Sequence, residues 1–279
     1  MIKKRSPARR DALGKALQLL SWIVDSSGEA TDREWGVREL AQGLHLPPAT
    51  VHRVLTTLMK HKLVQRNRHS GQYQIGMEFY RLALKTQSLP GIRNAGIPVM
   101  HDLVAQCNET ALLGLYDSFR MEMMFIAAVS SSHPLRYIVP INEWIPVYAG
   151  ASGLAIMAFL PKEERQAIIE RTKLTPLTER TITHPVALED ELARVRARGY
   201  AFSRGERTAG AVGIAAPIWG LTGRVMGDLM VTVPEPRFDE RMLLPLARRV
   251  IQHSQRIMGK IGAQAPPTGP MLHAASPRP

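Results

Sequence analysis

The chain has 279 residues, with 36 Lys and Arg against 24 Asp and Glu, a formal net charge of +12 and an isoelectric point of about 10.2. This length allows one large domain or two small ones. The basic surplus favours an anionic partner, with nucleic acid ranked before a membrane surface. A single cysteine, Cys107, excludes an intrachain disulfide and a Cys-based zinc site.

No apolar run approaches the length of a membrane span, and the basic N-terminus lacks the apolar segment of a secretory signal. We therefore expect a cytoplasmic protein that does not contact membranes. Neither a cluster of metal-ligating residues nor a glycine-rich phosphate motif is present, so we expect no metal and no cofactor.

Residues 1–10 contain five basic residues and no acidic one, and residues 1–70 contain 13 basic residues against 6 acidic ones. A short basic run is most often a solvated tail. Here it leads directly into a helical segment, which favours a basic arm (1–10) that lies along a polyanion.

Three helices are predicted between residues 11 and 62, because each segment has an apolar stripe at helical spacing. The stripe of the first helix is Leu13, Leu17, Leu20 and Val24. The second helix presents Val37, Leu40, Ala41 and Leu44. The third begins at Pro47-Pro48, where a missing amide proton costs little, and presents Val51, Val54, Leu55 and Leu58.

The stretch "LVQRNRHSGQYQIG" (63–76) then predicts two short strands around a turn at Ser70-Gly71. Three helices followed by a hairpin are typical of a winged helix-turn-helix, here over residues 11–78. In that motif the third helix enters the DNA major groove, where an Arg53 side chain could reach guanine. The alternative is an amphipathic helix with a solvated polar face. The predicted DNA contacts are Thr50, His52, Arg53, Thr56, Thr57 and Lys60 on the helix, and Arg66, Arg68 and His69 on the wing.

Residues 77–89 are predicted to be helical, with Phe79, Leu82 and Ala83 facing inward. Pro90-Gly91 interrupts this helix and marks the joint between two domains, so residues 79–97 are interpreted as a linker helix. Beyond it, residues 98–262 are predicted to form an α+β or α/β domain. Its expected strands lie within 110–131, 135–141 and 224–236, and its expected helices within 151–172, 186–200 and 240–261. The Pro- and Ala-rich end, 263–279, is expected to be disordered.

The stretch "YAGASGLAIMAFL" (148–160) predicts a turn from an extended segment into a helix that begins near Ala151. The first amides of a helix lack intrahelical acceptors, and the small residues Gly150, Ala151 and Ser152 do not shield them. A ligand carboxylate could bind there and also contact the Ser152 hydroxyl. The alternative is a tight strand-to-helix turn in which Ser152 is a local cap.

Over nearly its whole length the chain resembles the IclR family of bacterial transcription regulators. The resemblance rests on "LPPATVHRVLTTLMKHKLVQR", "GQYQIGMEFYRLA", "IPVYAGASGLAIMAFLPKEE", "LTPLTERTITHPVALEDELARVRARGYAFSRGE" and "AGAVGIAAPIWGLTGRVMGDLMVTVPEPR", in the family's order and spacing. It implies an α+β protein with a winged helix-turn-helix, a linker helix and a GAF-like α/β effector-binding domain. It further implies a homodimer or tetramer that binds a double-stranded DNA operator.

The resemblance also places a small-molecule effector in the C-terminal domain. Strand alternation puts Met230 and Thr232 on one face of the last strand, and the family directs that face toward the effector. Ser203-Arg204 stand where the family more often has acidic residues. Small residues and a carboxylate anchor favour an aromatic acid over a two- or three-carbon oxo acid. The implied effector contacts are Tyr148, Gly150, Ala151, Ser152, Ser203, Glu206, Ala211, Gly213, Met230 and Thr232.

The predicted function is thus a DNA-binding regulator whose operator binding or promoter activity is controlled by a small carboxylic acid effector. The alternative is an enzyme acting on a small organic acid, for which the candidate residues are His133, His184, Ser152, Glu206 and Cys107. Their spacing forms no recognisable nucleophile–base set. A third interpretation is a protein that coats DNA without sequence preference. The sequence does not distinguish an activator from a repressor.

Overall fold

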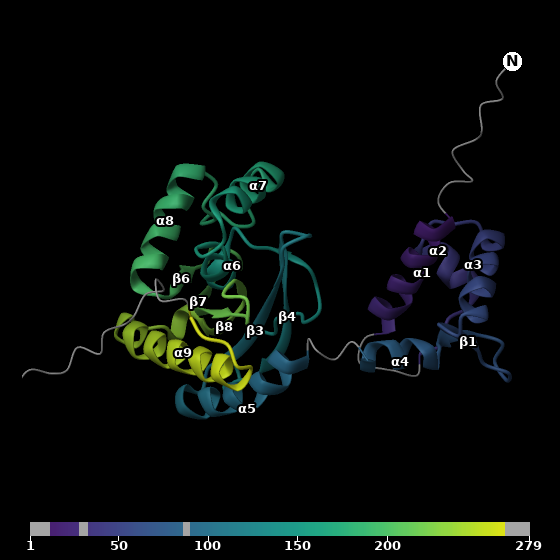
Figure 1. Ribbon diagram of the computed structural model, residues 1–279, viewed down its shortest axis with the longest axis horizontal. Helices are drawn as coiled ribbons and strands as arrows, with labels where there is room; N and C mark the ends of the chain where they lie inside the picture. The colour runs from purple at the N-terminus through teal and green to yellow at the C-terminus, as the bar shows by residue number, and fades with distance from the viewer. Residues whose placement is uncertain (1–11, 28–32, 86–89, 266–279) are drawn as a thin grey trace, which may run out of the picture. The chain divides into compact units, whose positions relative to one another are not determined.

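The computed structural model describes residues 12–27, 33–85 and 90–265, and divides into two compact units, residues 1–88 and 89–279 (Figure 1). Each unit has its own hydrophobic core. The predicted basic arm, residues 1–10, lies outside the described residues. Among the described helices, none is long and apolar enough to cross a membrane.

The first unit contains the predicted helices and hairpin: α1 (Ala12–Ser27), α2 (Val37–Gly43), α3 (Pro48–Lys60), β1 (Val64–Arg66), β2 (Tyr73–Ile75) and α4 (Met77–Lys85). Its core consists of the predicted faces of α2 and α3 packed on Leu19, Ile23 and Trp35. Pro48 occupies the first turn of α3, as expected. β1 and β2 are antiparallel, and Trp35 extends this small sheet through two backbone hydrogen bonds with Tyr73, of 2.8 and 2.9 Å.

Of the apolar stripe predicted for α1, only Leu20 packs against the core. Leu13 and Leu17 are 74% and 57% exposed, and Val24 is also exposed, whereas Leu19 and Ile23 are fully buried. The helix is apolar on two faces, so periodicity alone does not show which face the core selects. Leu82 of α4, expected to face inward, is likewise 44% exposed.

The second unit contains one antiparallel sheet of six strands in the order β5-β4-β3-β8-β7-β6. α5 and α9 pack together on one face of the sheet, and α6 packs on the other, with α7 and α8 beyond it (Figure 1). The strands are β3 (Thr110–Asp117), β4 (Glu122–Val129), β5 (Ile145–Pro146), β6 (Ala201–Arg204), β7 (Ala211–Trp219) and β8 (Val225–Pro234). The helices are α5 (Pro90–Cys107), α6 (Gly150–Met157), α7 (Lys162–Thr172), α8 (Pro185–Arg198) and α9 (Glu240–Lys260), and a 3₁₀ turn spans Glu235–Arg237.

Several predicted boundaries in this unit need correction. Residues 135–141 form no strand, although their apolar residues alternate, and β6 and β7 were not predicted. β7 is buried along almost its whole length and therefore lacks the alternation of a half-exposed strand. The linker segment 79–97 comprises the end of α4 and the start of α5, with 86–89 outside the described residues. Ala263 is buried, so order extends into the expected tail, whose residues 266–279 also lie outside the described part.

The first turn of α6 lies in very close contact with the chain that precedes it. A side chain at Gly153 would overlap the carbonyl oxygen of Val147, which is backbone and cannot move aside. Gly150 has a φ of +81°, a left-handed conformation that favours glycine. The small residues of this turn are therefore required by packing, whether or not a ligand binds.

This packing predicts that Gly153→Ala destabilises the protein, by roughly 1–3 kcal/mol for an overpacked core position. Gly259→Ala in α9 is the matched control, because nothing lies within 4 Å of its added methyl group. In the control, alanine should stabilise the helix by about 0.5–1 kcal/mol. Urea unfolding of both variants measures the difference, and a Gly153→Ala protein as stable as the wild type would show that the close contact is absent.

Candidate functional site

The outer face of α3 is polar and positively charged. His52, Arg53, Thr57 and Lys60 are exposed, and Thr50 and Thr56 are half-buried. Among the described residues, none of the charged groups on this face forms an ion pair with a carboxylate. Because these cations have no carboxylate partner, the outer face of α3 is available to bind a polyanion.

The two adjacent threonines of α3 have a different role from the cations. The Thr56 hydroxyl donates to the carbonyl of His52 (2.8 Å) and that of Thr57 to the carbonyl of Arg53 (3.1 Å). Both hydroxyl protons are thus already used within the helix. In this rotamer the hydroxyls can accept a hydrogen bond from a base but cannot donate to a phosphate.

The wing is held by an acidic residue that precedes it, which the sequence did not reveal. Both carboxyl oxygens of Glu34 accept hydrogen bonds from the wing, one from the Asn67 amide and the other from the Ser70 hydroxyl. These bonds lower the pKa of Glu34 below its usual value. Arg66 donates through Nε to the Gly71 carbonyl (2.7 Å), so its guanidinium is partly committed to the turn. Arg68 and His69 are exposed at the wing tip.

In the second unit, a cavity of about 450 Å³ lies between α6, the pocket-facing sides of β3, β4, β7 and β8, and the irregular segment 137–143. Its walls are mainly apolar. Of the ten predicted effector contacts, all but Tyr148 line it. Tyr148 is buried beside the cavity and donates its hydroxyl proton to the Thr175 carbonyl (2.6 Å). Further lining residues, which the sequence did not predict, include Leu112, Phe125, Tyr137, Ile138, Ile145, Leu177, Arg207 and Thr208.

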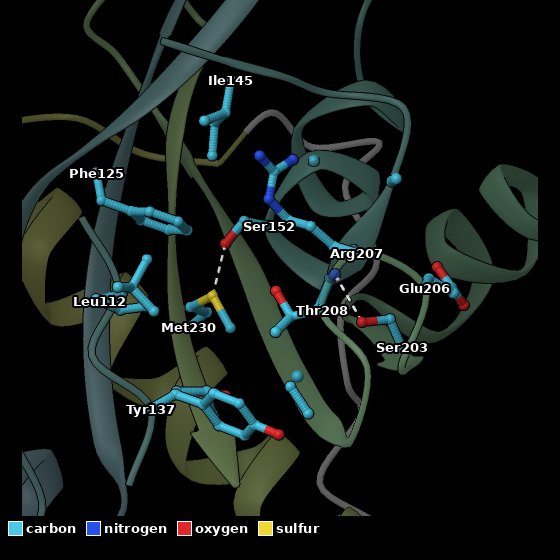
Figure 2. A pocket seen from close by; sticks show the side chains of 18 of the residues that line it. Leu112, Phe125, Tyr137, Ile145, Ser152, Ser203, Glu206, Arg207, Thr208 and Met230 are labelled. Atoms are coloured by element: carbon cyan, nitrogen blue, oxygen red, sulfur yellow. Dashed lines mark hydrogen bonds between the residues drawn. The ribbon is translucent and has the colours of Figure 1, made fainter. Parts of the chain in front are cut away.

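The prediction of a carboxylate site at the start of α6 assumed backbone amides without acceptors. In the structure these amides already have acceptors. The Ala151 amide donates to the Ser203 hydroxyl oxygen (2.9 Å; Figure 2). The Gly150 amide lies close enough to the Glu206 carboxyl to lower its pKa in part. Ser152 does not cap the helix: its hydroxyl donates to the thioether sulfur of Met230 (2.8 Å). The Ala151 amide and the Ser152 hydroxyl proton therefore both have acceptors within the pocket wall.

Glu206 and Arg207 are adjacent in sequence but extend in opposite directions. In Figure 2 the Arg207 side chain extends toward Ile145, whereas Glu206 points away from it toward the neighbouring helix. Burial, followed by the charge of Glu191, raises the pKa of Glu206 to about 7. Burial lowers the pKa of Arg207, and its guanidinium donates to the Pro146 carbonyl (3.1 Å).

A second carboxyl group lies directly behind the cavity wall. Asp228 is fully buried on β8, opposite Gly114 of β3, where any side chain would overlap its carboxyl group. Neither of its oxygens has a hydrogen-bond partner of standard geometry within the described residues. Burial raises the pKa of Asp228 to about 7, and the Ser152 hydroxyl lowers it only in part. Asp228 is therefore largely protonated below neutral pH.

The segment 135–141 that was expected to be a strand instead forms part of the cavity wall. Ile138, Val139 and Pro140 line the cavity, and the Tyr137 hydroxyl donates to the Ala209 carbonyl (3.1 Å), which ties the segment to the loop before β7. Residues 138–140 border the cavity and pair with no neighbouring strand, whereas Leu135 and Ile141 do not line it and are exposed.

The candidate catalytic residues form no nucleophile–base pair, although Ser152 and Glu206 line the same cavity. A ring nitrogen of His133 contacts the Asn108 amide (3.3 Å), and His184 is exposed at the start of α8. Ser152 bonds to a thioether sulfur and not to a base. Burial raises the pKa of Cys107, which disfavours its thiolate. Among the described residues, no group of His, Cys, Asp and Glu is arranged to hold a metal ion.

The buried Asp228 predicts a pH-dependent stability. Its ordinary pKa is 3.8, so above about pH 4 the unfolded chain loses this proton while the folded chain retains it until about pH 7. Stability is therefore lost as pH rises from about 4 to 7, on the order of a few kcal/mol, and the loss is constant above that. Asp228→Asn should remove the part of this pH dependence that comes from Asp228. The part that comes from the raised pKa of Glu206 should remain. Melting temperatures from pH 4 to 8 test this, with exposed Asp190→Asn as control. Parallel curves for wild type and Asp228→Asn would contradict it.

Comparison with known proteins agrees with this two-unit architecture. The model of the IclR helix-turn-helix domain matches residues 12–68, and the model of the bacterial transcriptional regulator IclR C-terminal domain matches residues 85–258. The transcriptional repressor IclR of Escherichia coli is 28% identical over 88% of this chain and 88% of its own length.

Solved structures show the same fold. An IclR transcriptional regulator from Silicibacter sp. TM1040 is 26% identical, with a TM-score of 0.75 over 93% of this chain and 99% of that one. An IclR homologue from Microbacterium hydrocarbonoxydans, crystallised with 4-hydroxybenzoate, is 23% identical, with a TM-score of 0.73 over 89% of this chain and 100% of that one. At that identity the likeness shows the fold alone.

These matches cover both units in the order that the sequence predicts, and the named relatives are regulators, which favours a regulator over the enzyme alternative. The chain belongs to the IclR family of bacterial transcriptional regulators, and its first unit is the family's DNA-binding helix-turn-helix domain.

Proposed function

We propose that this regulator responds to a small aromatic carboxylic acid bound in the cavity of its second unit. The observation that carries the proposal is the cavity itself, a space of about 450 Å³ with apolar walls and a few polar groups gathered at the start of α6. This volume is within the usual range for small-molecule sites, about 300–1,000 Å³.

The chemistry of the walls supports a ring. Leu112, Ile145 and Leu177 supply apolar surface, Phe125 adds a planar ring, and the small residues Ala151 and Gly213 leave room beside them. A two- or three-carbon oxo acid would leave most of this space unfilled. The 4-hydroxybenzoate in the Microbacterium homologue is an acid of the proposed class.

We further propose that α3 contacts operator bases through Arg53 and that Lys60, Arg66, Arg68 and His69 contact the DNA backbone. The regulator would act as a homodimer or a higher oligomer, because one winged helix reads few bases and a two-fold pair doubles the site. The exposed apolar stripe of α1, with Leu13 and Leu17, is a surface that a second copy could bury.

The DNA assignment predicts different effects for two cations of α3. Arg53→Ala should cost roughly 1–3 kcal/mol on the operator and relax the preference at one base position. Lys60→Ala should instead weaken operator and random DNA alike and reduce the salt dependence of binding. Binding titrations at several salt concentrations distinguish the two, and unchanged base preference in Arg53→Ala would remove α3 from the major groove.

The effector assignment predicts that a bound carboxylic acid changes operator affinity by about 5–150-fold, or changes promoter activity at similar affinity. Ala151→Leu should block the cavity, because residue 151 is buried and lines it, while operator binding without ligand is retained. Ala187→Leu on the exposed side of α8 is the control. Ligand titration and operator binding are measured together. A normal response in Ala151→Leu would place the effector elsewhere, and loss of ligand-free DNA binding would refute the separation of the two functions.

A further inference from the structure

We propose that Arg207 binds the carboxylate of the effector and thereby restricts the pocket to monocarboxylic acids. This inference rests on the proposed function, because it names the group that would recognise the acid. Small residues at the start of α6 favour its amides as the carboxylate site, but the amide of Ala151 already has an acceptor in Ser203.

Arg207 is fixed where its charge faces the cavity. The stem of its side chain lies against Gly150, where an added methyl group would be 3.0 Å from the Arg207 Cβ. One guanidinium nitrogen donates to the Pro146 carbonyl (3.1 Å), which holds the far end of the side chain beside β5. Arg207 lines the same cavity as Ser152 (Figure 2). The other guanidinium N–H groups have no acceptor within the described residues.

Arg207 also lacks a counter-ion. No carboxylate of the described residues lies within 4 Å of its guanidinium, whereas Arg204, Arg224 and Arg237 each pair with a glutamate. Burial partly removes this guanidinium from water and thereby lowers its pKa. A half-buried cation without a partner is costly, and a ligand carboxylate would remove that cost through charge-assisted, bidentate hydrogen bonds.

Two hydroxyl groups can assist the guanidinium. The Ser203 hydroxyl accepts from the Ala151 amide, so its own proton remains available to the cavity. The Ser152 hydroxyl donates to the Met230 sulfur, a weak acceptor that a carboxylate oxygen would readily replace. One cation and two hydroxyl donors suit a single carboxylate.

The remaining charges of the cavity disfavour a second carboxylate. Glu143 and Glu206 also line it, and Glu206, whose pKa burial raises to about 7, is ionised in part at neutral pH. A diacid would place its second charge among apolar side chains or near one of these acids. A neutral amide would leave Arg207 unpaired. The pocket should therefore prefer a monoacid to both.

The test is a thermal-shift screen of the full chain with aliphatic and single-ring aromatic monocarboxylates. Benzoate and 4-hydroxybenzoate are included, each paired with its amide and with benzene-1,4-dicarboxylate as the diacid. We expect a monoacid to raise the melting temperature more than its amide or the diacid. Calorimetry with the best monoacid should show at least tenfold weaker binding to Arg207→Gln. Arg207→Lys should retain part of the affinity, and exposed Arg248→Gln should retain all of it.

The outcomes separate the two proposals. Suppose that a monoacid binds the wild type and alters operator binding. If Arg207→Gln binds this acid equally well, or if the wild type binds the amide of the acid equally well, the role of Arg207 is refuted. The proposed function then stands. If none of the acids binds the wild type, both are refuted. Melting of the ligand-free Arg207→Gln protein checks its fold, and Arg207→Lys tests the charge requirement should the glutamine variant fail to fold.

Discussion

The close approach of α6 to the preceding chain determines where the cavity lies and what surrounds it. With no side chain at Gly153, the helix starts directly against the Val147 carbonyl, and Ala151 rests against Gly213 of β7. The first turn of α6 thereby forms one wall without filling the space in front of it. The left-handed Gly150 lies at the start of the same turn, and the stem of Arg207 lies against it.

The second unit keeps several ionisable groups out of water around one small space. Glu206 and Asp228 carry raised pKa values because their carboxylates are poorly solvated, and Arg207 carries a lowered one for the corresponding reason. Such groups are costly to a fold, and they are concentrated where ligands bind in many proteins. Asp228 lies within the sheet itself, so the stability of this unit is sensitive to the ionisation of that carboxyl group. These ionisable groups fit a site whose electrostatics become balanced only when a ligand is present.

Much of this architecture could be predicted because its periodic signals are strong. The buried faces of α2 and α3 follow helical spacing, and the hairpin with its turn at Ser70-Gly71 identifies the wing. β7 was missed because a strand buried on both faces has no alternation. The alternation in 135–141 was misleading, because the middle of this segment borders a cavity and its apolar ends, Leu135 and Ile141, are exposed. In α1, two apolar faces compete, and only tertiary packing selects Leu19 and Ile23.

In the pocket too, some residues could be predicted from local sequence and others could not. Small residues and strand alternation indicate Gly150, Ser152 and Met230 from local sequence, and they do line the cavity. Arg207 could not be recognised in this way, because charged residues in a loop are usually solvated, and what distinguishes it is the absence of a partner in three dimensions. Glu34 and Asp228 are comparable cases. The contacts of Glu34 lie more than thirty residues away, at Asn67 and Ser70. Asp228 is buried within a central strand.

The attachment of the wing to Glu34 has a consequence for the entropy of DNA binding. The Asn67 and Ser70 side chains are already held by one carboxylate, and Trp35 pairs with the strand that follows. A loose hairpin would have to lose its conformational freedom when it meets the double helix, at about 1–2 kcal/mol for each residue ordered. Here that freedom is lost when the domain folds. Contacts made by Arg68 and His69 with phosphates would then contribute to affinity without first ordering the loop that carries them.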